Sequence, residues 1–145
     1  MGVRLSTQDL ETIIYKMLNV SAIKDVINGG IYKEAFRPSN SGKIDICVNA
    51  LTLTRDNPQI GIANVNIYVQ DKKQTMNNVE NYVPDSILIK SITDTVVNTI
   101  DSSLDLPAFQ NISFFILNQK TYKNQDNEIK EHFQNLQVQF LITHN

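Results

Sequence analysis

Two long stretches of alternating apolar and polar residues, 43–54 and 60–69, constrain this chain most. In each stretch isoleucine, valine or alanine stands at every second position, with polar residues at most of the positions between them. Such alternation puts the apolar side chains on one face of a β-sheet. The Asn57-Pro58 pair between the stretches predicts a turn. The sequence therefore predicts an antiparallel hairpin, whose strands of about ten residues would each be roughly 30 Å long at ~3.3 Å per residue.

Two further segments have the periodicity of amphipathic helices. In 7–18 the apolar residues recur at the three- and four-residue spacing of a helix face, and Ser6 or Thr7 can cap its start. A second helix follows, and Pro107 closes it. Its apolar stripe consists of Ile89, Ile92, Val96, Ile100 and Leu104. We expect this stripe to pack against one face of the sheet.

The rest of the chain predicts strands, turns and one loop. Asn28-Gly29-Gly30 predicts a hairpin between two short strands that end near Arg37-Pro38. The polar segment 70–85 has no period and predicts a surface loop. The segment 112–122 is apolar on both faces, which is typical of a central strand. After a turn at 124–128, the alternation over 136–142 predicts a last strand.

The predicted order of elements is α-β-β-β-β-α-β-β. Strands and helices do not alternate regularly, so the fold class is α+β with a mainly antiparallel sheet, a long projecting hairpin and a helix packed on one face. The sequence contains no internal repeat or linker that would divide it. Residues 1–145 are therefore expected to form a single domain.

Composition excludes several classes of protein. Thirteen basic and fifteen acidic residues give a net charge of −2, which argues against broad affinity for nucleic acid. With 41% hydrophobic and 19% charged residues, the chain is neither disordered nor membrane-spanning in character. Its start lacks the apolar region of a secretory signal, and Gly2 fits a myristoylation pattern only loosely, with no polybasic second signal after it.

No catalytic or metal-binding motif stands out. His132 and His144 are expected to be exposed strand residues, since neither is at ligand spacing from another histidine or from Cys47. Cys47, the only cysteine, is expected in or near the core. Asp94 and Asp101 would lie on the polar face of the second helix. The sequence therefore predicts no enzyme activity, no cofactor and no metal site.

The tip of the long hairpin is the candidate interaction site. Such a hairpin would leave unpaired edges in a monomer, which proteins resolve by covering the edge or by assembling. We therefore expect the tip to contact a neighbouring subunit or partner through its polar residues, Arg55, Asp56, Asn57 and Gln59. The alternative is that the hairpin curls over its own core.

The order of elements resembles that of tail-terminator and tail-completion proteins of long-tailed bacteriophages. The resemblance covers nearly the whole chain and is strongest at 31–69, with IYKEAFRP, KIDICVNAL and GIANVNIYV. It implies a structural virion protein, made in the bacterial host cytoplasm and located in the tail or neck. Members form a homo-oligomeric ring, commonly of six subunits, that caps the tail tube. The implied partners are the tail tube protein and a head–tail connector or neck protein, with DNA passing through the lumen without specific binding.

Two other classes of function stay open at this stage. One is a small intracellular ligand-binding or enzymatic α+β domain with a cleft between the second helix and the sheet. The other is an interaction module that pairs an edge strand with a partner chain. Related neck and head-completion proteins have a similar size, so the resemblance does not separate a tail terminator from them.

Overall fold

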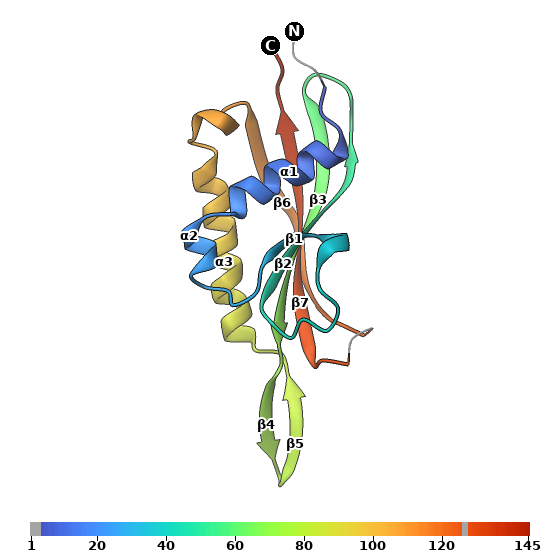
Figure 1. The fold of residues 1–145 in the computed structure, drawn as a ribbon, viewed down its shortest axis with the longest axis vertical. Coiled ribbons are helices and arrows are strands. Elements are labelled where there is room, and N and C mark those ends of the chain that lie inside the picture. The colour runs from blue at the N-terminus through green and yellow to red at the C-terminus, as the bar shows by residue number, and fades with distance from the viewer. Residues whose placement is uncertain (1–3, 126–127) are drawn as a thin grey trace.

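A computed structural model describes residues 4–125 and 128–145 (Figure 1). The chain runs through α1 (Thr7–Leu18), α2 (Ser21–Lys24), β1 (Ile31–Lys33), the 3-10 turn η1 (Glu34–Phe36), β2 (Asp45–Leu53), β3 (Gln59–Gln70), β4 (Lys72–Met76), β5 (Val79–Val83), α3 (Ser86–Ser103), the 3-10 turn η2 (Pro107–Phe109), β6 (Ile112–Lys123) and β7 (Glu131–Ile142). Gly2 and residues 126–127 of the predicted turn at 124–128 lie outside the described residues.

The main sheet has five strands in the order β1-β2-β3-β7-β6. The predicted hairpin is confirmed, because β2 and β3 pair antiparallel with Ile46 opposite Ile67. All other pairs in this sheet are antiparallel except β1 with β2, which is parallel. The α+β fold class with a mainly antiparallel sheet is therefore confirmed.

Helix α1 begins and ends close to the predicted residues because its first turn is capped. The Ser6 side chain accepts a hydrogen bond from the Asp9 backbone N–H, and the Asp9 carboxylate accepts one from the Ser6 N–H at 2.8 Å. This reciprocal pair satisfies two backbone donors that a helix leaves open. These hydrogen bonds, from the Ser6 backbone first, lower the pKa of Asp9.

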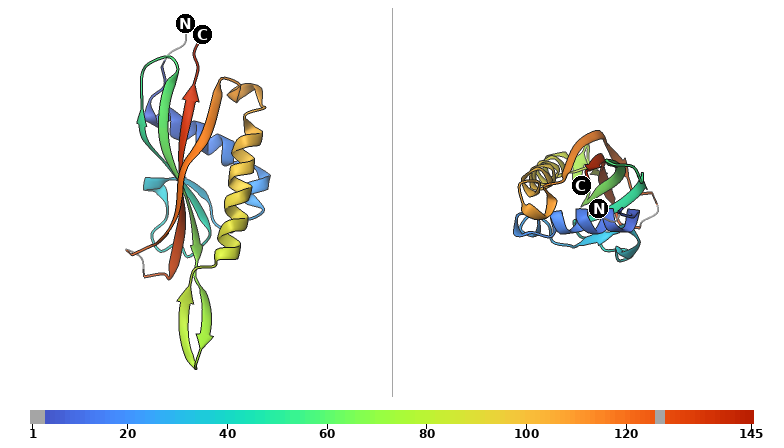
Figure 2. Two further views of the ribbon diagram at one scale, coloured as in Figure 1. Left: turned by 180° about the vertical axis from the view of Figure 1, so that it is seen from behind. Right: turned by 90° about the horizontal axis from the view of Figure 1, so that it is seen from above.

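Helices α1 and α3 cover the same face of the sheet, and the core lies between these helices and the sheet (Figure 2). The predicted α3 stripe is buried at Ile89, Ile92, Val96 and Ile100. It meets the inward residues of β3, of which Ala63, Val65, Ile67 and Val69 are fully or almost fully buried. Burial of one such aliphatic side chain contributes about 1.5–3 kcal/mol, so this interface holds the layers together.

The prediction of a hairpin at Asn28-Gly29-Gly30 is wrong. The first of its two strands is the short helix α2, and the second, β1, pairs parallel with β2. These glycines do not form a turn; they let the backbone pass close to Asp45. A Cβ on Gly29 would lie 1.9 Å from the Asp45 carboxylate. Gly30 donates its backbone N–H to that carboxylate at 2.8 Å.

The predicted loop at 70–85 is instead a second hairpin, β4–β5, which projects from the end of the body opposite the two termini (Figure 1). Its turn residues, Asn77 and Asn78, both have positive φ, of 51° and 63°. Asparagine tolerates this conformation, which a two-residue hairpin turn requires. The projecting hairpin is thus β4–β5, whereas β3 in the predicted hairpin pairs with β7 along its whole length.

Strand β6 is an edge strand, so the prediction that 112–122 is central is wrong. The central position belongs to β7, which pairs with β3 on one side and β6 on the other. Beyond Ile116 every residue of β6 is exposed. A strand that is apolar on both faces has the same sequence pattern whether both faces are covered or one lies open, which is why the pattern misled.

Candidate functional site

The tip of the β2–β3 hairpin binds the two ends of its own chain. Gln59 is fully buried, although it was expected to reach a partner. Its side-chain oxygen accepts a hydrogen bond from the Leu5 N–H at 2.9 Å, and its amide nitrogen donates to the carbonyls of Leu5 and Thr54. These bonds use both the donors and the acceptor of the amide. Gln59 is therefore an internal anchor, and its assignment to an outside contact is corrected.

Asn57 is exposed but also bonded within the chain. Its side-chain nitrogen donates to the His144 carbonyl at 2.7 Å, and its oxygen accepts from the His144 backbone N–H at 2.9 Å. The His144 ring nitrogen Nε2 lies 2.7 Å from the Gln59 oxygen. His144 is thus half-buried in this contact, and the prediction that it is an exposed strand residue is wrong.

Arg55 and Asp56 are exposed, as Asn57 is, but their side chains are not bonded within the described chain. The backbone carbonyl of Arg55 accepts a hydrogen bond from the Arg4 Nε at 3.1 Å. Neither side chain forms a hydrogen bond or ion pair with any described residue. Of the predicted site, these two residues alone remain free for an outside contact.

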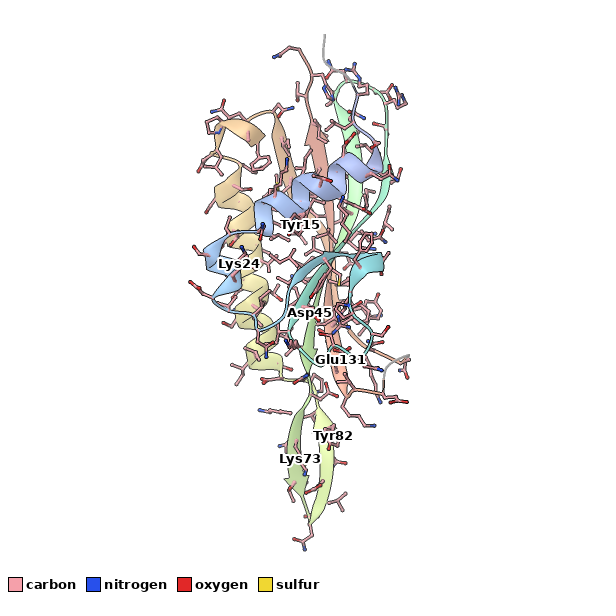
Figure 3. The ribbon with its side chains drawn as sticks, viewed as in Figure 1. Tyr15, Lys24, Asp45, Lys73, Tyr82 and Glu131 are labelled. Carbon is pink, nitrogen blue, oxygen red and sulfur yellow. The ribbon has the colours of Figure 1, made fainter. Side chains whose placement is uncertain are left out.

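A polar cluster on the sheet face opposite the helices went unnoticed in the sequence. Arg37 donates through Nε to Asp45 at 3.0 Å and through both terminal nitrogens to Glu131 at 3.1 and 3.0 Å. Both carboxylates are fully buried, and Figure 3 shows them close together on neighbouring parts of the body. Ser41 donates to Asp45 and Asn124 donates to Glu131, so further hydrogen bonds hold each carboxylate.

The electrostatics of this cluster favour a structural role. Burial lowers the pKa of Arg37, but the hydrogen bonds and charges of Glu131 and Asp45 outweigh it and leave that pKa raised. The guanidinium is thereby held charged between its two partners. It links the segment after β1 to β2 and to the start of β7. Arg37 and Glu131 are 94 positions apart in the sequence. An arginine that is bonded to two buried carboxylates holds their segments together through charge-assisted hydrogen bonds.

The structure also places the titratable residues that the sequence analysis singled out. Cys47 is buried, as expected, and burial raises the pKa of its thiol to about 12. His132 is not the exposed residue expected, because its side chain is 16% exposed and its Nδ1 lies 2.5 Å from Asp71 Oδ1. Asp94 pairs with Lys90 on the surface of α3 at 2.6 Å. No group of three or more potential metal ligands lies together among the residues that the structure describes.

Strand β6 presents an open edge with large apolar side chains beside it. Within the described chain no strand pairs with its outer side. Phe115, Leu117 and Tyr122 are 53%, 41% and 41% exposed. The opposite edge, β1, has only three residues. A long edge strand is a template for pairing with another chain, and no described strand pairs with the outer side of β6.

Two pockets flank helix α3. The larger, of about 480 Å³, lies among the ends of α1 and α3, helix α2 and η2. The smaller, of about 330 Å³, lies between α3 and the β6–β7 strands, where a cleft was expected. Thr93 lines it, and its buried hydroxyl forms no hydrogen bond within the described structure.

None of the described helices is long and apolar enough to cross a membrane. No known protein-family model matches the chain, and no curated protein matches it.

Proposed function

We propose that this chain is a structural assembly subunit that forms a homo-oligomeric ring, like the phage tail terminators that its element order resembles. The open edge of β6 carries this proposal. Twelve residues of unpaired strand edge, with Phe115 and Leu117 exposed beside it, form a surface that pairing with a neighbouring subunit would bury. An unlike surface on the neighbour makes the contact heterologous, and heterologous contacts form a ring when the rotation between neighbouring subunits closes.

The projecting β4–β5 hairpin supports the same function. An isolated two-stranded hairpin is marginally stable in water. Every residue of β4 is exposed, and Met76 and Val79 near the turn are each 57% exposed. The hairpin thus gives each subunit a second protruding surface, suited to a contact along the axis of the assembly. The proposed partners are the tail tube protein and a head–tail connector or neck protein.

The sheet face opposite the helices suits a lumen through which DNA passes without specific binding. On β2, β3 and β7, away from the Arg37 cluster, this face carries neutral amide side chains, which alternate with inward residues of the same strands, whereas Lys120 lies on the same face of β6. The amides are those of Asn49, Asn64, Gln137 and Gln139. Neutral amides offer phosphate no counter-charge, so DNA would gain little by stopping there. In this proposal the chain acts in the virion tail or neck and catalyses no reaction.

Light scattering tests the proposal. We expect the purified protein, alone or with tube protein, to have a mass several times 16.5 kDa. Phe115→Asp should abolish that assembly and the ability to complete tails, because it puts a charge into the proposed interface, while the melting temperature stays close to wild type. Ile87→Asp is the matched control, since Ile87 is 80% exposed on α3. A wild-type protein that stays monomeric with tube protein present would refute the ring.

The alternative, a small ligand-binding or enzymatic domain, is favoured by the Thr93 hydroxyl in the smaller pocket. A buried hydroxyl without a partner costs about 1–3 kcal/mol, and a bound polar ligand would repay it. The replacement Thr93→Val keeps the shape and removes the hydroxyl. A more stable variant that still assembles would favour the structural subunit, whereas loss of binding to a metabolite by a monomeric protein would favour the alternative.

A further inference from the structure

The larger pocket has the size and lining of a small-molecule site. Its volume of about 480 Å³ lies within the range of known ligand pockets, roughly 300–1,000 Å³. Its lining residues belong to α1, α2, α3, η2 and the residues that precede α2 and η2, and none belongs to β6 or to the β4–β5 hairpin. A ligand bound there would not compete with the proposed assembly surfaces.

Much of the wall of this pocket is apolar. Met17 and Phe109 form buried parts of its wall, and Val20 and Leu106 are 36% and 50% exposed at the pocket. Two helices and a 3-10 turn thus hold apolar side chains around a space that their own packing does not fill. An apolar group entering the space would remove these side chains from water, which is the main source of affinity in such sites.

The polar residues of the lining favour a ligand with a negative charge. Lys16, in the last turn of α1, is the one charged side chain that lines the pocket. Its ammonium group has no hydrogen-bond or ion-pair partner among the described residues. Beside it lie Asn98 and Ser102 on α3, whose side chains likewise have no described partner. The hydroxyls of Thr95 and Thr99 donate to backbone carbonyls of their own helix. Toward a ligand, these two hydroxyls can therefore only accept hydrogen bonds.

We propose that this pocket binds an amphipathic organic anion, with its apolar body against Met17 and Phe109 and its carboxylate or phosphate beside Lys16. A cation with no carboxylate partner at the rim of an apolar space matches such a ligand in both charge and polarity. The amide of Asn98 and the hydroxyl of Ser102 supply hydrogen bonds to the anionic head. The site is independent of the ring proposed above.

Titration of the full-length ¹⁵N-labelled protein with 4-phenylbutyrate, followed by NMR, tests this inference. We expect saturable shifts at the amides of Met17, Val20 and Phe109 with a Kd on the order of 1 mM, as suits a ligand of this size. Lys16→Gln should weaken binding about three- to fivefold at low salt, the range for an exposed ion pair. Lys24→Gln, which changes the same charge on α2 outside the pocket lining, should have a smaller effect.

Two further comparisons complete the test. The neutral 4-phenyl-1-butanol should bind wild type and Lys16→Gln equally, because it has no charge for the lysine to attract. Ala22→Phe, at an exposed lining position, should fill the pocket and remove the shifts, whereas Ala35→Phe on η1 should not. The absence of saturable shifts up to 20 mM, on the order of twenty times the expected Kd, would overturn the inference. So would shifts that persist unchanged in Ala22→Phe.

Discussion

The Cζ atom of Arg37 lies 3.9 Å from the centre of the Tyr68 ring. The guanidinium thus stacks on an aromatic face while its nitrogens reach Asp45 and Glu131 in the plane. Tyr68 in turn packs against Phe133, with ring centres 5.0 Å apart, and Phe133 against Tyr122 at 5.4 Å. One arginine therefore joins the buried charges to an aromatic row that crosses three strands.

Arg37→Met should destabilise the protein by about 3–5 kcal/mol, because it leaves two buried carboxylates without their cation. Arg37→Lys should recover only part of the loss, since one ammonium cannot supply the bidentate bond to Glu131 and the bond to Asp45 together. Urea unfolding measures both effects. Arg55→Met, at an exposed arginine, is the control and should change the free energy of unfolding by less than about 0.5 kcal/mol.

Val96→Asp should unfold the domain or destabilise it by several kcal/mol. Val96 is fully buried in the middle of the α3 stripe, and an unpaired carboxylate there loses its hydration. Ile87→Asp on the same helix should be close to neutral because that side chain is 80% exposed. Circular dichroism melts compare the two, and equal melting temperatures would contradict the packing described for α3.

The hairpin tip should divide into two kinds of residue. Gln59→Ala should cost about 1–3 kcal/mol, because it leaves the backbone groups of Leu5 and Thr54 without partners. Ala at Arg55 and Asp56 should leave stability unchanged. If these two residues contact a partner, as the sequence predicts, their replacement should reduce the assembled mass measured by light scattering. The melting temperature should not change.

Stability should fall with rising pH above about 9. Burial raises the pKa of Cys47 from 9.0 to about 12 and that of Tyr68 from 10.0 to about 12. The folded chain therefore keeps protons that the unfolded chain releases from pH 9 or 10 upward, so stability that is complete below pH 9 is lost toward pH 12. The slope should approach about 1.4 kcal/mol per pH unit for each group.

Urea unfolding between pH 8 and 11 measures this slope. Cys47→Ala should remove the loss of stability that begins near pH 9. The loss that begins near pH 10, from Tyr68, should remain. The same burial predicts that the native thiol reacts with Ellman's reagent at pH 8 only as fast as the protein opens. Rapid modification of the folded protein would contradict the position of Cys47.

Deletion of the projecting hairpin should leave the body folded. Residues 73–82 are exposed throughout, and the Lys130 ammonium of the body lies 5.9 Å from the centre of the Tyr82 ring. A two-residue Asn-Gly turn after Lys72 should therefore give a protein with a melting temperature close to wild type. The tail completion proposed for this chain should fail in the variant if the hairpin makes the axial contact. A large loss of stability would show that the hairpin supports the core.

Periodicity predicted the elements whose burial alternates cleanly. The sequence predicted β3 and the stripe of α3 correctly because one face of each is more deeply buried than the other. It also predicted β2 from the alternation of apolar residues, although Asp45–Val48 are buried on both faces. Strand β6 was misplaced because Phe115 and Leu117 are apolar but uncovered. The hairpin β4–β5 was missed because its polar strands have no buried face, and Asn77-Asn78 was its only signal.

The candidate site was less predictable, because its contacts join distant residues. Gln59 was expected at a surface, but whether a glutamine in a turn faces water depends on where Leu5 and His144 lie. The pairing of Arg37 with Glu131 spans 94 positions, and no local pattern signals it. Only the order of strands in the sheet brings these residues together.

That order has a consequence for synthesis. Strand β7, the last of the chain, lies at the centre of the sheet between β3 and β6, and it supplies four fully buried residues to the core. While the ribosome is still making residues 131–142, β3 and β6 have no strand between them. The β3–β7 and β6–β7 pairs, of which the first joins residues far apart in the sequence, can therefore form only after residues 131–142 have emerged. Without residues 131–142, strands β1, β2 and β3 could still pair with one another, but no strand would join β6 to them.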